Sequence, residues 1–307
     1  MGHLANGKAQ VLSIGGGCYP LPTMRTASLR LTVGRPKRGP VGTIIETLHS
    51  VYQRRRLLLY LTIARVRQDG SNSLIGNLWL IIDPAVQLAI YYFLVGVVLN
   101  RPQANFPLFL FAAILPWRWF SMALSSATDS VRAQDKVMRQ ISFPQIVLPI
   151  ASVAASTTSF FFGLIPLFSL YLVYPDRLTV WVCTLPLIIG IQVMWTIPFA
   201  ILLSAVNVFF RDTGNFVRHG LRLAFYLSPA LFSFERIQEL LAPYPPANLL
   251  LQLNPMAWII TGYRDILYEG RAPDWIALAV VGLASVPFIL VSIYVFRRLA
   301  PSFVKVL

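Results

Sequence analysis

Long apolar stretches with almost no charged residue recur along this chain and are separated by short polar or basic segments. A helix needs about 20 predominantly apolar residues to cross a hydrocarbon core about 30 Å thick. The pattern therefore predicts an all-α, polytopic integral membrane protein. We predict six transmembrane helices, at residues 78–99, 106–127, 146–174, 178–209, 221–234 and 276–296.

The fifth of these stretches is too short to cross a bilayer comfortably. It leads into an apolar segment, residues 240–260, which is broken by Pro243, Pro245, Pro246 and Pro255. Interrupted backbone is tolerated at membrane depth only where it is buried in protein or lines a cavity. We therefore predict a short re-entrant segment between spans five and six.

Two segments precede the first span. Residues 1–42 are rich in Gly, Pro, Lys and Arg without an apolar period, which predicts a disordered basic tail. In residues 43–75, apolar positions fall on one helical face against several arginines, which predicts an amphipathic helix on the anionic inner leaflet followed by a loop. An ordinary soluble helix is the alternative. The transmembrane domain is then residues 76–299, and residues 300–307 form a cytoplasmic tail.

Composition supports membrane residence, and the distribution of charge gives the orientation. The 307 residues are 56% hydrophobic and 12% charged, whereas soluble domains carry about 25% charged residues. The net charge of +14 comes from basic residues that gather in alternate loops, eleven of them before the first span. The positive-inside rule then places both termini in the cytoplasm. The basic balance therefore indicates membrane topology, and we expect no nucleic-acid partner.

The sequence lacks the common catalytic motifs. It contains no G-x-x-x-x-G-K-[ST] loop for phosphates, no H-E-x-x-H and no G-x-S-x-G. The charged candidates within spans are Asp83 and Arg118, which disfavours a proton-coupled carrier. Cys18 and Cys183 are far apart and have no metal-ligand spacing. We expect no catalytic residue, no metal and no cofactor on this chain.

Five short motifs lie at the ends of the apolar stretches, and together with Leu-Pro-Trp at 115–117 they resemble one family in this order and topology. They are Leu-Ile-Gly-Asn-Leu-Trp at 74–79, Ile-Ser-Phe-Pro-Gln-Ile-Val-Leu-Pro at 141–149, Asn-Val-Phe-Phe-Arg-Asp at 207–212, Tyr-Leu-Ser-Pro at 226–229, and Asn-Pro at 254–255 followed by Tyr-Arg-Asp-Ile-Leu-Tyr at 263–268. The family is the membrane subunit of type-2 ABC exporters, in the branch that exports O-antigen, capsule or teichoic-acid polysaccharides. The chain departs from the family pattern in a longer loop at 68–73 and in Asp83, where Asn is common before Pro.

The resemblance implies a permease subunit rather than an enzyme. Two copies would form a conduit lined mainly by spans one and five, in the cytoplasmic membrane of a bacterium. A separate cytoplasmic P-loop ATPase subunit would bind ATP and Mg²⁺, and the substrate would be a lipid-linked glycan. The alternatives are a type-2 permease for a drug or small lipid and, more distantly, a membrane glycosyltransferase or acyltransferase.

The loop at residues 129–140 combines an apolar stripe of Val131, Gln134, Val137 and Met138 with mixed charge, a pattern typical of a short helix that docks into a groove. In the resembling family this loop is the coupling helix that receives motion from the ATPase. A solvated loop is the alternative. The residues assigned to coupling are Asp135, Lys136, Val137 and Arg139.

Two further sets of residues are candidates for contact with substrate. Cations at the inner surface would bind a lipid diphosphate or serve only to retain positive charge inside. This set, with an aromatic at the start of span one, is Arg54, Arg55, Arg56, Arg65, Arg67 and Trp79. Tyrosine hydroxyls within a span need a polar partner, and the residues assigned to the channel are Tyr91, Tyr92, Tyr226 and Ser228.

Overall fold

A computed structural model describes residues 11–14, 17–20, 40–71, 76–98, 105–140 and 143–306. The chain divides into two units, Met1–Arg38 and Gly39–Leu307. In the first unit, β1 (Val11–Ile14) pairs antiparallel with β2 (Gly17–Pro20). The remainder of the predicted tail up to residue 39 lies outside the described residues, as do positions 74–75 and 141–142 of the motifs.

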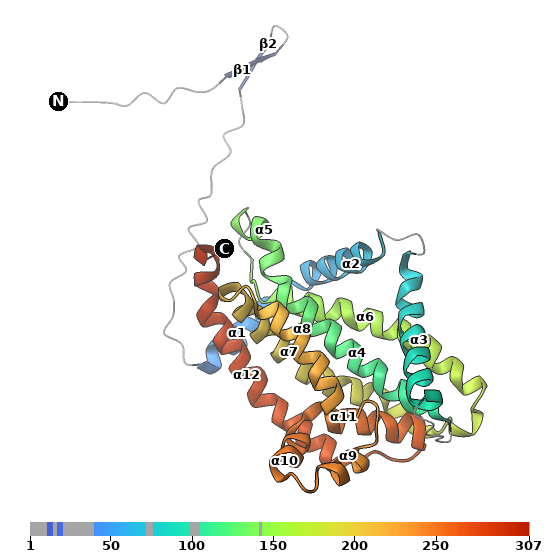
Figure 1. Ribbon diagram of the computed structural model, residues 1–307. Coiled ribbons are helices and arrows are strands. Elements are labelled where there is room, and N and C mark those ends of the chain that lie inside the picture. Colours follow the sequence, from blue (N-terminus) through green and yellow to red (C-terminus); the bar gives the residue numbers. More distant parts are fainter. Residues whose placement is uncertain are drawn as a thin grey trace, which may run out of the picture. The chain divides into compact units, whose positions relative to one another are not determined.

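The second unit is helical (Figure 1). A π-helical turn (Tyr92–Val98) extends α3, and another (Asp265–Glu269) follows α11. The helices are α1 (Pro40–Gln53), α2 (Arg55–Ser71), α3 (Trp79–Tyr91), α4 (Phe106–Ser130), α5 (Asp135–Gln140), α6 (Val147–Ser169), α7 (Leu185–Phe209), α8 (Thr213–Leu227), α9 (Phe234–Leu241), α10 (Pro245–Leu253), α11 (Pro255–Arg264) and α12 (Trp275–Val306).

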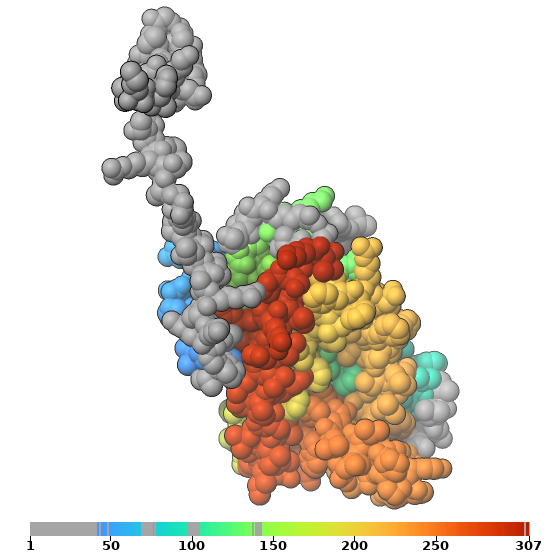
Figure 2. All heavy atoms as spheres, turned by 90° about the vertical axis from the view of Figure 1, so that its left-hand side faces the viewer, coloured from blue at the N-terminus to red at the C-terminus, as the bar shows by residue number. Residues whose placement is uncertain are grey.

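Within the described ranges, five segments are long and apolar enough to cross a membrane. They are Trp79–Val97, Phe106–Ser130, Val147–Leu172, Val180–Phe209 and Trp275–Phe303. α5 and the C-terminal end of α12 lie at one end of the unit, and α9 and α10 lie at the other (Figure 1). In Figure 2, α12 (red) runs along one face, and the orange residues that precede it gather at one end. The prediction of a helical, polytopic membrane protein is confirmed.

α4 is the central helix, and nearly all its side chains are buried against α6, α7, α8 and α11. Polar side chains of α7 bind backbone carbonyls of α4. Gln192 Nε2 donates to the Pro116 carbonyl over 2.8 Å, and Asn207 Nδ2 donates to the Thr128 carbonyl over 3.0 Å. Such bonds hold apolar helices together where hydrophobicity alone cannot discriminate between protein and lipid.

The predicted fifth span is wrong in its bounds, because the segment before it forms the first turns of the helix. α8 begins at Thr213 and has 15 residues, so it is not among the membrane-length helices. Its early turns carry Arg218, which lies outside the predicted span, and Arg222, which lies at the start of it. The helix ends because Ser228 takes an extended conformation (φ −96°, ψ 156°), as expected of a residue that precedes proline.

The predicted re-entrant segment consists of short helices that begin at prolines instead of being broken by them. Pro245 and Pro255 occupy the first positions of α10 and α11, where the missing N–H is not needed. Asn254 caps α11, because its Oδ1 accepts from the Met256 backbone N–H over 3.0 Å. Asn254 Nδ2 also donates to Ser228 Oγ over 3.0 Å. The start of α11 is therefore tied to the end of α8.

Arg264, the last residue of α11, ties the same turn to α4. Its guanidinium donates to the carbonyls of Phe232 over 2.6 Å, Ala230 over 2.8 Å and Phe109 over 3.4 Å. It also lies over the Phe109 ring, 3.8 Å from the centroid. The turn after α8 is thus fixed from two sides.

The single amphipathic helix predicted for residues 43–75 is two helices with a turn at Arg54. α1 packs on α12, where Arg297 Nη1 donates to Thr47 Oγ1 over 2.9 Å and lies 3.7 Å from Glu46 Oε2. α2 instead packs on α6 and leaves Leu59 exposed. One straight helix cannot follow both surfaces, so the chain turns between them.

The segment predicted as a C-terminal tail continues α12 as far as Val306. Phe303 is fully buried, and its ring lies 5.3 Å from Phe296 and 5.8 Å from Phe209. A buried aromatic residue anchors this end of α12 to α7, so these last turns belong to the core of the unit.

Candidate functional site

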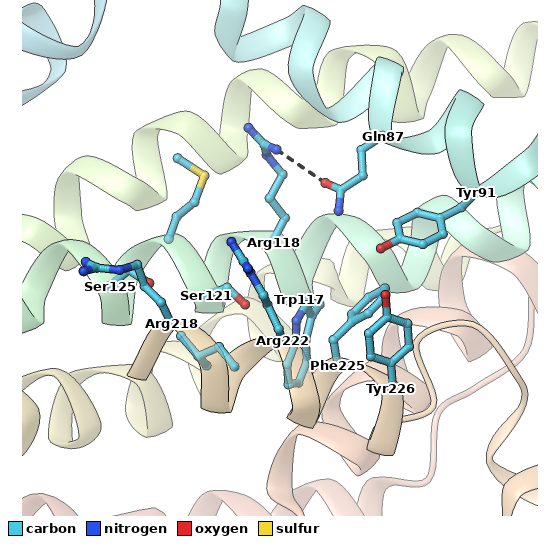
Figure 3. Close-up of a pocket in the computed structure, with 12 residues that line it drawn as sticks. Gln87, Tyr91, Trp117, Arg118, Ser121, Ser125, Arg218, Arg222, Phe225 and Tyr226 are labelled. Atoms are coloured by element: carbon cyan, nitrogen blue, oxygen red, sulfur yellow. Dashed lines mark hydrogen bonds between the residues drawn. The ribbon is translucent and has the colours of Figure 1, made fainter. Parts of the chain in front are cut away.

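A cavity of about 540 Å³ opens between α3, α4 and α8 (Figure 3). Its wall combines cationic, aromatic and hydroxyl side chains with no acidic residue. The lining residues are Gln87, Tyr91, Trp117, Arg118, Ser121, Met122, Ser125, Arg218, Leu221, Arg222, Phe225 and Tyr226.

Helical spacing arranges this wall. Residues four apart lie on one helix face, about 6 Å along the axis. On α8 this spacing aligns Arg218, Arg222 and Tyr226, and on α3 it aligns Gln87 and Tyr91. Because α8 runs antiparallel to α4 (Figure 1), the arginines lie toward the end that carries α5 and the tyrosine lies deeper.

The deeper part of the cavity is aromatic. The Phe225 ring lies 5.4 Å from Tyr91, 5.9 Å from Trp117 and 5.4 Å from Tyr226, measured between centroids. The hydroxyl groups of Tyr91 and Tyr226 point toward one another across the cavity (Figure 3). This part presents flat apolar faces with polar edges, a surface that suits a ring with apolar and hydroxylated sides.

The two outer arginines have carboxylate partners at the margin of the cavity. Arg118 Nη2 on α4 lies 3.0 Å from Asp83 Oδ2 on α3. Arg218 Nη1 on α8 lies 3.4 Å from Asp129 Oδ2 near the end of α4. Arg222 lies one turn after Arg218 on α8. It has no hydrogen bond or ion pair with any residue that the structure describes.

The structure brings two of the four predicted channel residues together. Tyr91 and Tyr226 line the cavity, whereas Tyr92 lies outside it and packs 6.2 Å from the Phe106 ring. Ser228 is buried in the turn after α8 and bound by Asn254, so its motif has a structural explanation. The arginines on α4 and α8 were not predicted as lining residues. The four-residue spacing of Arg218, Arg222 and Tyr226 was the signal that could have found them.

Comparison with curated proteins identifies the family, although no family model matches the chain. The "O-antigen export system permease protein RfbA" of Myxococcus xanthus is 32% identical, over 83% of this chain and 97% of its own length. This chain belongs to the O-antigen export permease family. Two Klebsiella pneumoniae permeases of the same name are 28% and 27% identical, each over 82% of this chain and 95% of their own length. The predicted resemblance to polysaccharide-export permeases is confirmed.

The arginines at the turn between α1 and α2 and on α2 of the permease have two different environments. Arg65 Nη1 donates to Ser152 Oγ and, over 3.2 Å, to Ser126 Oγ, so this side chain joins α2 to α6 and α4. The remaining members of the predicted set are exposed, and Arg55 lies over the Tyr52 ring. They are Arg54, Arg55, Arg56, Arg67 and Trp79. Arg65 therefore has a packing role that sequence alone did not indicate.

Two residues of the apolar stripe predicted to dock a partner are instead part of the permease's own core. Val131 and Met138 are buried in a cluster with residues of α1, α6, α7 and α12. Lys136 is exposed and Asp135 is half-buried, whereas the side chains of Val137 and Arg139 lie outside the description. The buried Met138 therefore anchors α5 to the unit. The charged side chains Asp135 and Lys136 remain accessible on its other face.

A metal centre finds no support in the part of the permease that the structure describes. No group of three or more His, Cys, Asp or Glu residues there could hold a metal ion. The charges of the cavity wall are cationic, so they favour anions over metal ions. The lining of the candidate site suits anionic and ring-containing groups.

Proposed function

We propose that this permease is the membrane subunit of an ATP-driven exporter that moves a lipid-linked O-antigen polysaccharide across the bacterial cytoplasmic membrane. The observation that carries the proposal is the cavity between α3, α4 and α8, with arginines at one end and aromatics at the other. Aromatic faces stack on the apolar faces of sugar rings, while the tyrosine hydroxyls remain available for hydrogen bonds. The names of the curated relatives point to the same substrate class.

The open side of the cavity supports a conduit between two copies of the chain. Charged side chains at membrane depth face a bundle interior or a water-filled cavity, because exposure to hydrocarbon is costly. Arg222 is exposed on the open side of the single chain. Apolar residues of the elements that form the cavity are also exposed, such as Phe93 in the turn that extends α3 and Leu223 on α8. A second copy that covers this side would bury the apolar flanks and enclose the arginines in an aqueous path.

We assign six membrane crossings to each copy, with α8 as the short fifth one and α9–α11 as the re-entrant segment. α8 is short because the turn that Asn254 and Arg264 hold lies within the unit. Backbone of this kind at membrane depth requires protein or water around it. The positive-inside rule then places both termini in the cytoplasm, on the side of α1, α2 and α5.

ATP hydrolysis belongs to a separate P-loop ATPase subunit that holds ATP and Mg²⁺, and α5 is its contact. The buried Met138 joins α5 to the cluster that includes Ile44 of α1, Val208 of α7 and Phe296 of α12. A push on the charged face of α5 would therefore reach several helices at once. This is how a rigid packed core transmits displacement.

The exposed arginines at the α1–α2 turn and on α2 form the proposed access surface for the lipid-linked substrate. Leu59, Tyr60 and Ile63 on α2 are exposed beside them. A helix with exposed apolar residues and arginines suits the interface of an anionic leaflet. Arg54, Arg55, Arg56 and Arg67 would attract the diphosphate of the carrier there.

Loss of the gene tests this function. We expect surface O-antigen to disappear while its lipid-linked form accumulates inside the cell. Reintroducing the chain with an active ATPase partner should restore the surface glycan. Reintroducing it with a partner whose P-loop lysine is replaced should not.

Other results would contradict the proposal in distinguishable ways. Failure of the glycan to be made at all, instead of its accumulation inside, would indicate a glycosyltransferase or acyltransferase. Unchanged surface glycan together with altered drug sensitivity would indicate a drug permease. Genes for sugar-nucleotide and glycosyl transfer beside this one would favour the polysaccharide exporter.

A further inference from the structure

We infer that the half of the cavity nearer α5 is a binding site for a phosphate-bearing anion, with Arg222 as its principal contact and with Arg118 and Arg218 on either side. The inference rests on the proposed function and deepens it. It places the diphosphate of the lipid-linked substrate inside the cavity, on α4 and α8, rather than only at the surface arginines of the α1–α2 turn and α2.

Arg222 is available to a ligand. Among the described residues it has no hydrogen-bond or ion-pair partner, and it lines the cavity from α8. Its side chain extends toward α4 past Ser121 (Figure 3). Ser121 Oγ is itself buried and has no hydrogen-bond partner. A charged group and a hydroxyl without partners both line this part of the wall, and an anion that accepts from both would satisfy them.

The neighbouring arginines are held in place and retain donors for a ligand. Arg118 Nη2 donates to Asp83 Oδ2 over 3.0 Å, and Arg118 Nη1 donates to Gln87 Oε1 over 3.4 Å. Arg218 Nη1 donates to Asp129 Oδ2 over 3.4 Å, and Arg218 Nη2 donates to Asn215 Oδ1 over 2.7 Å. A guanidinium carries five N–H groups, so neither arginine is exhausted by these bonds. Asp83 and Asp129 balance Arg118 and Arg218, so Arg222 is left to be balanced by a bound anion.

A diphosphate fits this arrangement better than a neutral sugar does. Arg218 and Arg222 lie one helical turn apart, about 6 Å along α8, so they can contact two linked phosphate groups. Arginine binds phosphate oxygens through two parallel hydrogen bonds and stays charged at any relevant pH. The aromatic half of the cavity, around Phe225, begins one turn further along α8. A headgroup on the arginines would thus place the attached glycan against the aromatic wall.

The placement of Arg65 strengthens this assignment. Its hydrogen bonds to Ser126 and Ser152 engage it between helices, so it is not a free cation of the surface set. Arg67 remains exposed on α2 and is the better representative of a surface site. The two locations can therefore be separated by single substitutions.

The test measures binding to the complex of permease and ATPase in nanodiscs. The probes are a polyprenyl diphosphate, the corresponding polyprenyl monophosphate and inorganic pyrophosphate. The variants are Arg222→Gln, Arg67→Gln and, as a matched control, Arg298→Gln. Arg298 is an exposed cation on α12 that does not line the cavity. We expect Arg222→Gln to weaken polyprenyl diphosphate binding by about ten- to hundredfold and Arg298→Gln to leave it unchanged.

Each outcome has a defined meaning. A stronger loss with the diphosphate than with the monophosphate supports two linked phosphates as the ligand. Competition by inorganic pyrophosphate supports recognition of the anion itself, and its absence supports recognition of the lipid-borne headgroup. Equal affinities for Arg222→Gln and Arg298→Gln, or a loss confined to Arg67→Gln, would overturn the cavity site. Either result would leave the proposed export function standing if the gene is still required for surface glycan.

Discussion

Methionine in place of Arg264 is expected to lower the free energy of unfolding of the permease by about 3 kcal/mol and to reduce the yield of folded protein. The change removes the donors for three carbonyl groups, those of Phe109, Ala230 and Phe232. Each buried acceptor left without a donor costs about 1–3 kcal/mol, partly offset because a buried charge is also removed. Thermal unfolding of the purified protein, followed by intrinsic fluorescence, measures the effect.

Arg236→Met provides the matched control at the same end of the unit. Arg236 pairs with Glu239 over 3.2 Å, but both side chains are more than half exposed. Exposed pairs contribute about 0–1 kcal/mol, so this variant should unfold near the wild-type temperature. Equal behaviour of the two variants would show that Arg264 does not hold the turn after α8.

Neutralising the charged face of α5 is expected to separate ATP hydrolysis from export. The variant carries Asp135→Asn, Lys136→Gln and Arg139→Gln together. Because the buried Met138 anchors the helix, the protein should still insert and assemble. Coupling between sites is typically 1–3 kcal/mol, so export should fall by about tenfold or more while the ATPase continues to turn over.

Lys305→Gln is the control for this variant, since Lys305 is an exposed charge near the end of α12. It should leave both ATP hydrolysis and export unchanged. Surface glycan and ATP turnover are measured on the same cells and on the complex purified from them. Full export by the triple variant would remove α5 from the coupling mechanism.

The sequence predicted the uniformly apolar helices well, because their signal is strong and local. The bounds predicted for the second span begin at Phe106, as α4 does. α8 was misplaced because its first turns are amphipathic and its arginines face a cavity that exists only after folding. The sequence alone does not show whether arginines beside an apolar run lie in a loop or on a helix that lines a cavity, because the cavity is formed by the neighbouring helices.

The candidate site was predicted in part for the same reason. Tyr91 and Tyr226 were identified because a tyrosine hydroxyl within a span requires a partner. Arg222 was not assigned to the site, and its place on the cavity wall with Ser121 became visible only when α8 packed on α4. Conversely, Met138 looked like a docking residue because burial within the same chain has the same apolar signature.

The central claim is that the glycan passes along the wall formed by α3, α4 and α8. The most direct measurement is photocross-linking during active export, with a benzophenone amino acid in place of Tyr226. The same group in place of Leu283, an exposed residue on α12, serves as the control. We expect O-antigen polymer to become attached to the permease at position 226 and not at position 283. Attachment at position 283 alone, or equally at both positions, would contradict the account.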